Sequence, residues 1–108
     1  MRVLVTGATG LIGTEVIRQL KARGDEVVTM VRRPPENDSQ REWQPDRGYL
    51  QPGTLDGIDA VVNLAGATTG KLPWTKRYKD ELIWSRVRAT ELLVAAMAES
   101  KKPPKVFV

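Results

Sequence analysis

The stretch Arg2–Gly13, which reads RVLVTGATGLIG, decides the fold of this chain. It begins with a short run of apolar and β-branched residues, which predicts a buried strand. Three glycines, Gly7, Gly10 and Gly13, follow at the spacing G-x-x-G-x-x-G. From residue 11 to residue 23 apolar side chains recur at helical spacing, so a helix is predicted directly after the glycine turn.

Each of the three glycines has a distinct structural role in a loop of this kind. One permits the tight turn from strand to helix, one lets backbone N–H groups approach a pyrophosphate, and one lets helix and strand pack closely. The free N–H groups and partial positive charge of the helix N-terminus then favour phosphate. A glycine-rich turn without a ligand is the alternative, and the flanking strand and helix favour the ligand.

The next residues complete a β-α-β unit. The predicted helix carries Ile12, Val16 and Leu20 on one stripe, which Ile17 widens. Gly24 stands where a helix C-terminus favours a left-handed residue. The valine-rich run from residue 26 to residue 31 predicts a second strand.

The end of that second strand indicates which dinucleotide would bind. An NAD site usually places Asp or Glu there, as acceptor for the ribose 2′-OH. Here Arg32 and Arg33 follow the strand, whereas Asp25 and Glu26 lie at its opposite end. A guanidinium at Arg32 could form two hydrogen bonds to a 2′-phosphate. NADP(H) is therefore predicted over NAD(H); the alternative is that both arginines are exposed loop charges.

The remaining chain continues the alternation of strands and helices. Residues 33–57 contain four prolines and are expected to be mostly loop, with 41–43 as a short edge strand. Residues 59–64 predict a buried strand, 75–100 a helix and 105–108 a last strand. The apolar stripe of that helix comprises Ile83, Val87, Thr90, Val94 and Met97, with Leu93 and Ala96 alongside. The predicted fold class is α/β, a Rossmann-type doubly wound parallel sheet that stops after about the fifth strand.

The glycine stretch, together with Asn63-Leu64-Ala65-Gly66, resembles the extended or atypical short-chain dehydrogenase/reductase superfamily. More narrowly, the chain resembles the "epimerase family" proteins of that group, which are NAD(P)-dependent epimerase/dehydratase-like. The features that carry this narrower resemblance are Asp59–Gly66, Trp74-Thr75 and Ser85-Arg86-Val87 with Thr90. The similarity extends over nearly the whole chain.

The resemblance implies a doubly wound sheet that binds NADP(H) from three places: the glycine loop along the pyrophosphate, the arginines near the 2′-phosphate, and the segment after residue 63 beside the adenosine half. The implied cofactor-binding residues are Gly7, Thr9, Gly10, Leu11, Ile12, Gly13, Arg32, Arg33, Leu64, Ala65 and Gly66. For Ser85 and Arg86, on the helix beside the cleft, a packing role and a cofactor contact both remain open.

The Tyr-x-x-x-Lys pair of the superfamily has no counterpart in this chain. The resemblance implies hydride transfer assisted by a Tyr-x-x-x-Lys pair and a nearby Ser or Thr, with the lysine lowering the tyrosine pKa. Tyr49 is followed four residues on by Gly53, and Tyr78 by Leu82. In the family the pair comes after the strand at which this chain stops. No catalytic residue is predicted here, and the chain alone is expected to be inactive.

Composition excludes several other classes of site. The chain has no cysteine and no histidine, so disulfides, thiolate metal sites, Ser-His-Asp catalysis and the commonest zinc sites are excluded, and no metal is predicted. No run approaches the about 18 apolar residues of a membrane helix, and the N-terminal apolar run is too short for a signal peptide. A cytoplasmic protein without a membrane partner is expected. The net charge of +4 favours an anionic partner without identifying one.

The last predicted strand, 105–108, has no turn or polar tail after it. We therefore expect residues 1–108 to be the incomplete N-terminal dinucleotide-binding domain of a longer protein, with the substrate domain absent and self-association through the exposed sheet edge. Its predicted partners are the dinucleotide and, in the full-length parent only, a small-molecule substrate. The alternative is a non-catalytic dinucleotide-binding sensor or partner-binding module. Nucleic-acid binding through Lys71–Lys79, with Trp74 and Tyr78 stacking, is disfavoured because aromatic residues at helix starts are more often core anchors.

Overall fold

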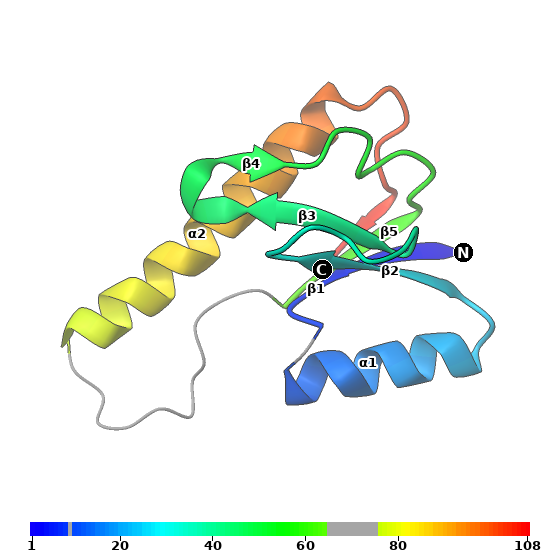
Figure 1. The fold of residues 1–108 in the computed structure, drawn as a ribbon, viewed down its shortest axis with the longest axis horizontal. Coiled ribbons are helices and arrows are strands. Elements are labelled where there is room, and N and C mark those ends of the chain that lie inside the picture. Colours follow the sequence, from blue (N-terminus) through cyan, green and yellow to red (C-terminus); the bar gives the residue numbers. More distant parts are fainter. Residues whose placement is uncertain (9, 65–75) are drawn as a thin grey trace.

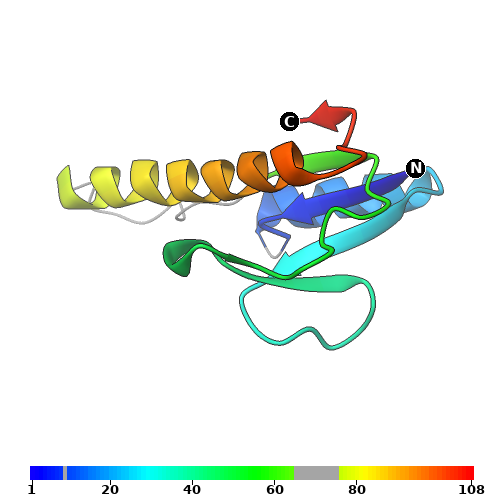
Figure 2. The same cartoon turned by 90° about the horizontal axis from the view of Figure 1, so that it is seen from above.

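The computed structural model describes residues 1–8, 10–64 and 76–108, including all side chains of these residues except those of 76–86. One six-stranded sheet has the order β4-β3-β2-β1-β5-β6 (Figures 1 and 2). The strands are β1 (Arg2–Thr6), β2 (Glu26–Val31), β3 (Gln40–Gln44), β4 (Tyr49–Leu50), β5 (Ala60–Asn63) and β6 (Val106–Phe107). All neighbouring strands pair in parallel except β3 and β4, which are antiparallel. The predicted Rossmann-type α/β fold is confirmed.

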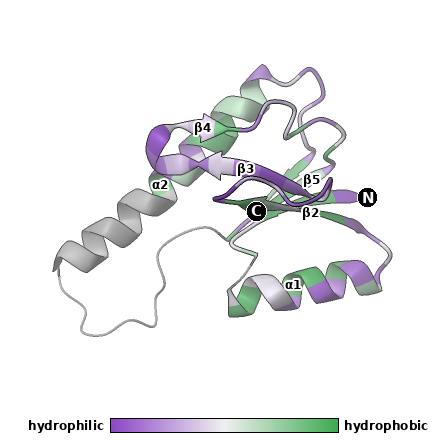
Figure 3. Ribbon diagram, viewed as in Figure 1, coloured by the Kyte–Doolittle hydropathy of each residue, from purple (hydrophilic) through white to green (hydrophobic). Residues whose placement is uncertain are grey.

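Two helices cover opposite faces of the sheet: α1 (Leu11–Ala22) and α2 (Lys76–Glu99) (Figure 1). Successive strand residues point to opposite faces, so each strand contributes to two cores. The core beneath α1 comprises Val3, Val5, Val27 and Ala60, with Ile17, Leu20 and Val62 packed against it. The core beneath α2 comprises Leu4, Val28, Met30, Trp43, Leu55, Ile58, Val61, Ala89 and Leu93. Figure 3 shows the corresponding concentration of apolar residues along β2 and β5, while β3 is largely polar.

Helix α1 begins and ends where the glycines indicate. Gly10 is its N-cap residue, and Gly24 follows its C-cap with a left-handed φ of +89°. The amide of Gly24 donates to the carbonyl of Lys21 at 3.0 Å, which satisfies one of the free carbonyls at the helix end. The predicted apolar stripe is wrong at Ile12, whose side chain is 68% exposed. Ile12 lies in the first turn of α1, beside the glycine loop at the carboxyl ends of the strands, whereas Ile17 packs over the strands.

The buried face of α2 is rotated from the predicted stripe. Ala89 and Leu93 are fully buried, and Ala96 and Met97 pack beside them. Val94, which was predicted to lie on the stripe, is 51% exposed. One residue corresponds to about 100° of rotation around a helix, so burying Leu93 turns Val94 away from the sheet.

The segment predicted to be mostly loop contains more structure than its prolines suggest. Strand β3 pairs with β2 on one side and with β4 on the other, so it is not an edge strand. A 3₁₀ turn, η1 (Pro45–Arg47), follows β3, and Gly48 reverses the chain at a φ of +67°. Trp43 then lies opposite Leu50 and is buried beneath α2. Arg88 of α2 pairs with Asp46 of η1 at 3.0 Å, which ties this corner to the helix.

Over the described parts of the chain, neither helix combines the length and the apolar character needed to cross a membrane.

Candidate functional site

The candidate site lies where the direction of strand addition reverses. From β1 the chain adds β2 and β3 on one side, and then returns to add β5 and β6 on the other. In open α/β sheets, ligands bind outside the carboxyl ends of the two strands at such a switch point. The glycine loop follows β1, and Leu64 follows β5.

Gly7 and Gly13 are required by the local structure of the protein, without reference to a ligand. Gly7 has a left-handed φ of +71°, and a Cβ at this position would lie 2.6 Å from the carbonyl oxygen of Leu64. A Cβ on Gly13 would lie 2.2 Å from the carbonyl oxygen of Gly7. Both distances are shorter than real Cβ contacts allow, so a side chain at either position would force the backbone to move. These two glycines let β1, α1 and the end of β5 approach one another.

Gly10 differs from the other two glycines of the loop. Its φ of −73° and ψ of 167° are accessible to any residue, and the nearest described atom to a Cβ there is the Gly7 carbonyl oxygen at 3.6 Å. Neither the backbone nor crowding among the described residues therefore requires glycine. A side chain at this N-cap position would instead stand beside the free N–H groups of the first helical turn.

The N-terminus of α1 has neither an acidic side chain nor a side-chain cap on its free N–H groups. No acidic residue lies in its first turn, and the glycine at its N-cap offers no side chain to occupy the free N–H groups. The hydroxyl of Thr14 donates to the Gly10 carbonyl at 2.8 Å. The side chains of Leu11 and Ile12 are 92% and 68% exposed, so the described protein leaves this turn uncovered.

A hydrogen-bonded chain fixes the carboxyl ends of β1 and β5. Thr6 and Asn63 are paired in register, and the buried Thr6 hydroxyl donates to Asn63 Oδ1 at 2.6 Å. Asn63 Nδ2 donates in turn to the hydroxyl of Thr90 on α2 at 3.1 Å. The Leu64 amide donates to Thr6 Oγ1 at 3.0 Å. These hydrogen bonds were not predicted from the sequence, although a polar residue ends both strands.

The two arginines after β2 lie in different electrostatic environments. Arg33 Nε lies 3.5 Å from Glu36 Oε1. The exposed guanidinium of Arg32 makes no ion pair with any residue that the structure describes. The backbone carbonyl of Arg32 accepts a hydrogen bond from Gln44 Nε2 at 2.9 Å. Of the two arginines predicted to bind the 2′-phosphate, only Arg33 is therefore paired with a carboxylate among the described residues.

Several predicted site residues fall outside the part of the chain that the structure describes. Thr9, Ala65 and Gly66 lie outside the described residues, as do Lys71 and Trp74. The side chains of Ser85, Arg86 and Tyr78 are not described either. Within the described part of the chain, no three acidic side chains come close enough to hold a metal ion.

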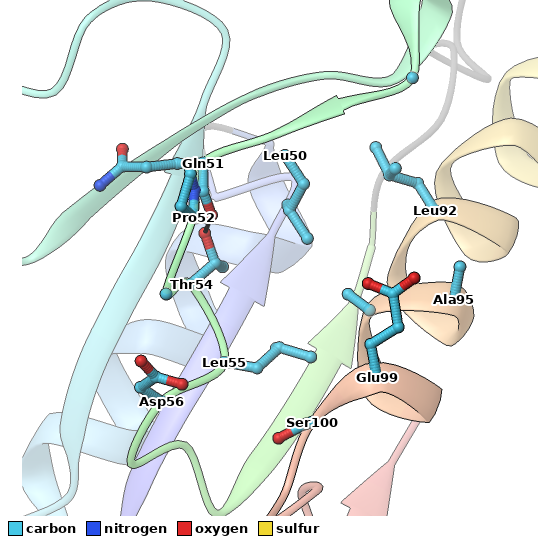
Figure 4. A pocket seen from close by; sticks show the side chains of 13 residues that line it. Leu50, Gln51, Pro52, Thr54, Leu55, Asp56, Leu92, Ala95, Glu99 and Ser100 are labelled. Carbon is cyan, nitrogen blue, oxygen red and sulfur yellow. Dashed lines mark hydrogen bonds between the residues drawn. The ribbon is translucent and has the colours of Figure 1, made fainter.

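A separate cavity of about 410 Å³ lies between the segment after β3 and the second half of α2 (Figure 4). Leu50, Leu55 and Leu92 line it, and the carboxylates of Asp56 and Glu99 stand among its polar residues. The hydroxyl of Thr54 is already bonded to the Gln51 carbonyl. None of its lining residues belongs to the glycine loop, and they form no arrangement of nucleophile and base.

The fold and the glycine loop at its switch point define a Rossmann-type α/β protein. The profile of the NAD dependent epimerase/dehydratase family matches residues 3–108, and the chain belongs to that family. The resemblance inferred from the sequence is thereby confirmed.

Known proteins of this family are similar over most of the chain. The human epimerase family protein SDR39U1 is 38% identical over 110 residues, covering 100% of this chain and 36% of its own length. Its isoform 2, solved with NADPH, superimposes with a TM-score of 0.80 at 36% identity, over 99% of this chain and 35% of that one. An epimerase family protein of Mycobacterium tuberculosis is 38% identical over 98 residues, which are 91% of this chain and 33% of its own.

A solved bacterial sugar epimerase is also similar. The nucleoside-diphosphate sugar epimerase of Corynebacterium glutamicum superimposes with a TM-score of 0.74 at 33% identity, over 95% of this chain and 21% of that one. The chain spans about a third of the length of the curated relatives described above.

Proposed function

We propose that this chain is the NADP(H)-binding part of an oxidoreductase or of a nucleotide-sugar epimerase-like protein. The observation that carries the proposal is Gly10, where neither backbone conformation nor crowding among the described residues requires glycine. A ligand that approaches the N-terminus of α1 closely would supply that requirement. A pyrophosphate suits the site, because the first turn carries free N–H groups and no acidic residue.

Arg32 supports NADP(H) over NAD(H). It follows β2 at the same edge of the sheet as the glycine loop, and β2 lies directly beside β1. The two residues directly after this strand are Arg32 and Arg33, with no carboxylate at the position where an NAD site accepts from the ribose 2′-OH. The human relative solved with NADPH is consistent with this choice.

The reaction belongs to the whole protein, of which this chain corresponds to about a third in its relatives. A bound nicotinamide would donate or accept a hydride. The residues described here would bind and orient the dinucleotide, and the proton-transferring groups would come from elsewhere in the protein. Because one relative is named a nucleoside-diphosphate sugar epimerase, a nucleotide sugar is the substrate class that we propose to test first.

The proposal is tested with the variants Arg32→Ala and Arg33→Ala. If Arg32 binds the 2′-phosphate, its replacement removes charge-assisted hydrogen bonds, and NADPH should bind on the order of tenfold to a hundredfold more weakly. NADH binding should be nearly unchanged. Arg33 is the matched control, because its guanidinium already faces Glu36, and its loss should matter less. Equal weakening of NADPH and NADH by Arg32→Ala would contradict the proposed 2′-phosphate contact.

A further inference from the structure

We propose that Gln44 is a positioning residue for the 2′-phosphate subsite, because it holds the backbone from which Arg32 extends. The inference rests on the proposed function, and adds to it a residue on another strand that sets the preference between the two dinucleotides.

The position of Gln44 follows from strand register. Strands β2 and β3 run in parallel, and Val31 pairs with Glu42 as the last partners along β2. Gln44 ends β3 two residues later, so it lies beside the segment that follows β2. Its Nε2 donates to the Arg32 carbonyl at 2.9 Å, a normal hydrogen-bond length. The side-chain amide thus continues the interaction between these strands past the end of their paired residues.

The other contacts in this segment act on later residues. Arg33 faces Glu36 at 3.5 Å, and the amide of Glu36 donates to Gln40 Oε1 at 2.9 Å. Pro34 and Pro35 restrict the backbone between Arg33 and Glu36. Among these contacts, only the Gln44 bond reaches Arg32, whose guanidinium has no ion pair in the described structure.

The chemistry of Gln44 suits this role. A charge-assisted hydrogen bond depends on geometry, and a backbone already held in place loses less freedom when phosphate binds. The amide of Gln44 is neutral, so it fixes the Arg32 carbonyl without competing for the guanidinium. A carboxylate at the same position could not donate to that carbonyl, and would attract the guanidinium away from a phosphate.

The experiment compares wild type with Gln44→Met by fluorescence titration with NADPH and NADH, and by calorimetry with adenosine 2′,5′-bisphosphate and AMP. Met preserves the length of the side chain and removes the donor. The variant should bind NADPH and the bisphosphate roughly fivefold to twentyfold more weakly, which is the loss of part of one charge-assisted contact. NADH and AMP, which lack the 2′-phosphate, should change less than about twofold.

Gln51→Met is the matched control. Gln51 Oε1 accepts a hydrogen bond from the amide of Glu42 at 2.9 Å, so this variant loses a glutamine side-chain bond to the backbone of β3 and leaves Arg32 untouched. It should leave the ratio of NADPH to NADH affinity unchanged. Gln44→Glu is a second test that keeps the side-chain size, and it should lower the ratio further than Gln44→Met.

The outcomes separate the inference from the proposed function. If Arg32→Ala lowers the NADPH preference while both Gln44 variants leave it unchanged, the role of Gln44 is refuted and the proposed function stands. If Gln44→Met weakens all four ligands equally, Gln44 supports the fold or the adenine and the inference is also refuted. If wild type shows no preference for NADPH, the proposed function fails and the inference fails with it.

Discussion

Gly7, Gly10 and Gly13 share one motif but serve different purposes. A Cβ at Gly7 or Gly13 would lie 2.6 Å or less from a backbone oxygen, so these residues are fixed by the close approach of β1, β5 and α1. At Gly10 a Cβ would make an ordinary contact of 3.6 Å. The fold therefore requires glycine at positions 7 and 13, whereas at position 10 only the close approach of a ligand would require it.

We therefore expect Gly10→Ala and Gly13→Ala to have opposite profiles. Gly10→Ala should reduce the free energy of unfolding by at most about 1 kcal/mol, the usual effect of a poorer N-cap, and should weaken NADPH binding at least about tenfold. Gly13→Ala should reduce the free energy of unfolding by more than about 3 kcal/mol, because the backbone of the loop must move. Urea unfolding and NADPH titration measure the two effects. A Gly10→Ala protein with unchanged affinity would show that the site tolerates a side chain there.

A second prediction at this scale concerns the acid titration of Glu15. Hydrogen bonds from Arg18 and Gln19, at 2.6 Å and 3.0 Å, lower the pKa of its carboxyl from 4.5 to about 2. Because the folded-state pKa is lowered, the contacts contribute to stability above pH 4.5, and this contribution is lost as the pH falls towards 2. The carboxyl resonance of Glu15, followed by NMR, should titrate near pH 2 in wild type and closer to its ordinary value in Arg18→Ala. A wild-type midpoint near 4.5 would mean that the contacts do not persist in solution.

At the scale of the elements, local patterning accounts for most of what could be predicted. Strand β2 and helix α1 have the predicted bounds within one residue, because apolar periodicity and flanking glycines determine both. The structure between β3 and β4 could not be predicted, because β4 has two residues and depends on the reversal at Gly48. The prediction for α2 was wrong at Val94, because the adjacent apolar residues Leu93 and Val94 do not specify which side of the helix faces the sheet.

The candidate site was predictable to the extent that it is local in sequence. The glycine loop and Arg32 could be identified from neighbouring residues alone. The bonds that join Asn63 to Thr90 and Gln44 to Arg32 link residues 27 and 12 positions apart. Such pairs require knowledge of strand order and register, which single-sequence patterns do not contain.

The link between β5 and α2 gives an element-scale prediction. Thr90→Val preserves shape but removes the acceptor of the Asn63 amide hydrogen bond. The free energy of unfolding should fall by about 1 to 3 kcal/mol, and Thr90→Ser should restore most of it because it retains the hydroxyl. Urea denaturation of the three proteins measures the difference. Equal stability of the Val variant and wild type would mean that the bond contributes nothing net.

For the whole molecule, the edge formed by β6 exposes apolar side chains among the described residues. β6 is the outermost strand on its side, and the side chains of Val106, Phe107 and Val108 are 46%, 36% and 70% exposed. Unpaired backbone groups beside apolar side chains favour strand addition from another molecule. We expect the 108-residue chain to self-associate and Phe107→Lys to reduce the association. Sedimentation velocity across a range of concentrations tests this, and a monodisperse wild-type monomer would contradict it.

The cytoplasmic location expected from the sequence stays a prediction.

We propose that the glycine loop and Arg32 together bind NADP(H). The most direct measurement is a titration of the purified chain with NADPH and, separately, with NADH, following cofactor or tryptophan fluorescence. We predict saturable binding of both, with NADPH about tenfold or more tighter, as expected for a guanidinium that contacts a 2′-phosphate. Equal affinity would contradict the role of Arg32, and no binding of either dinucleotide would contradict the claim that this chain assembles the site.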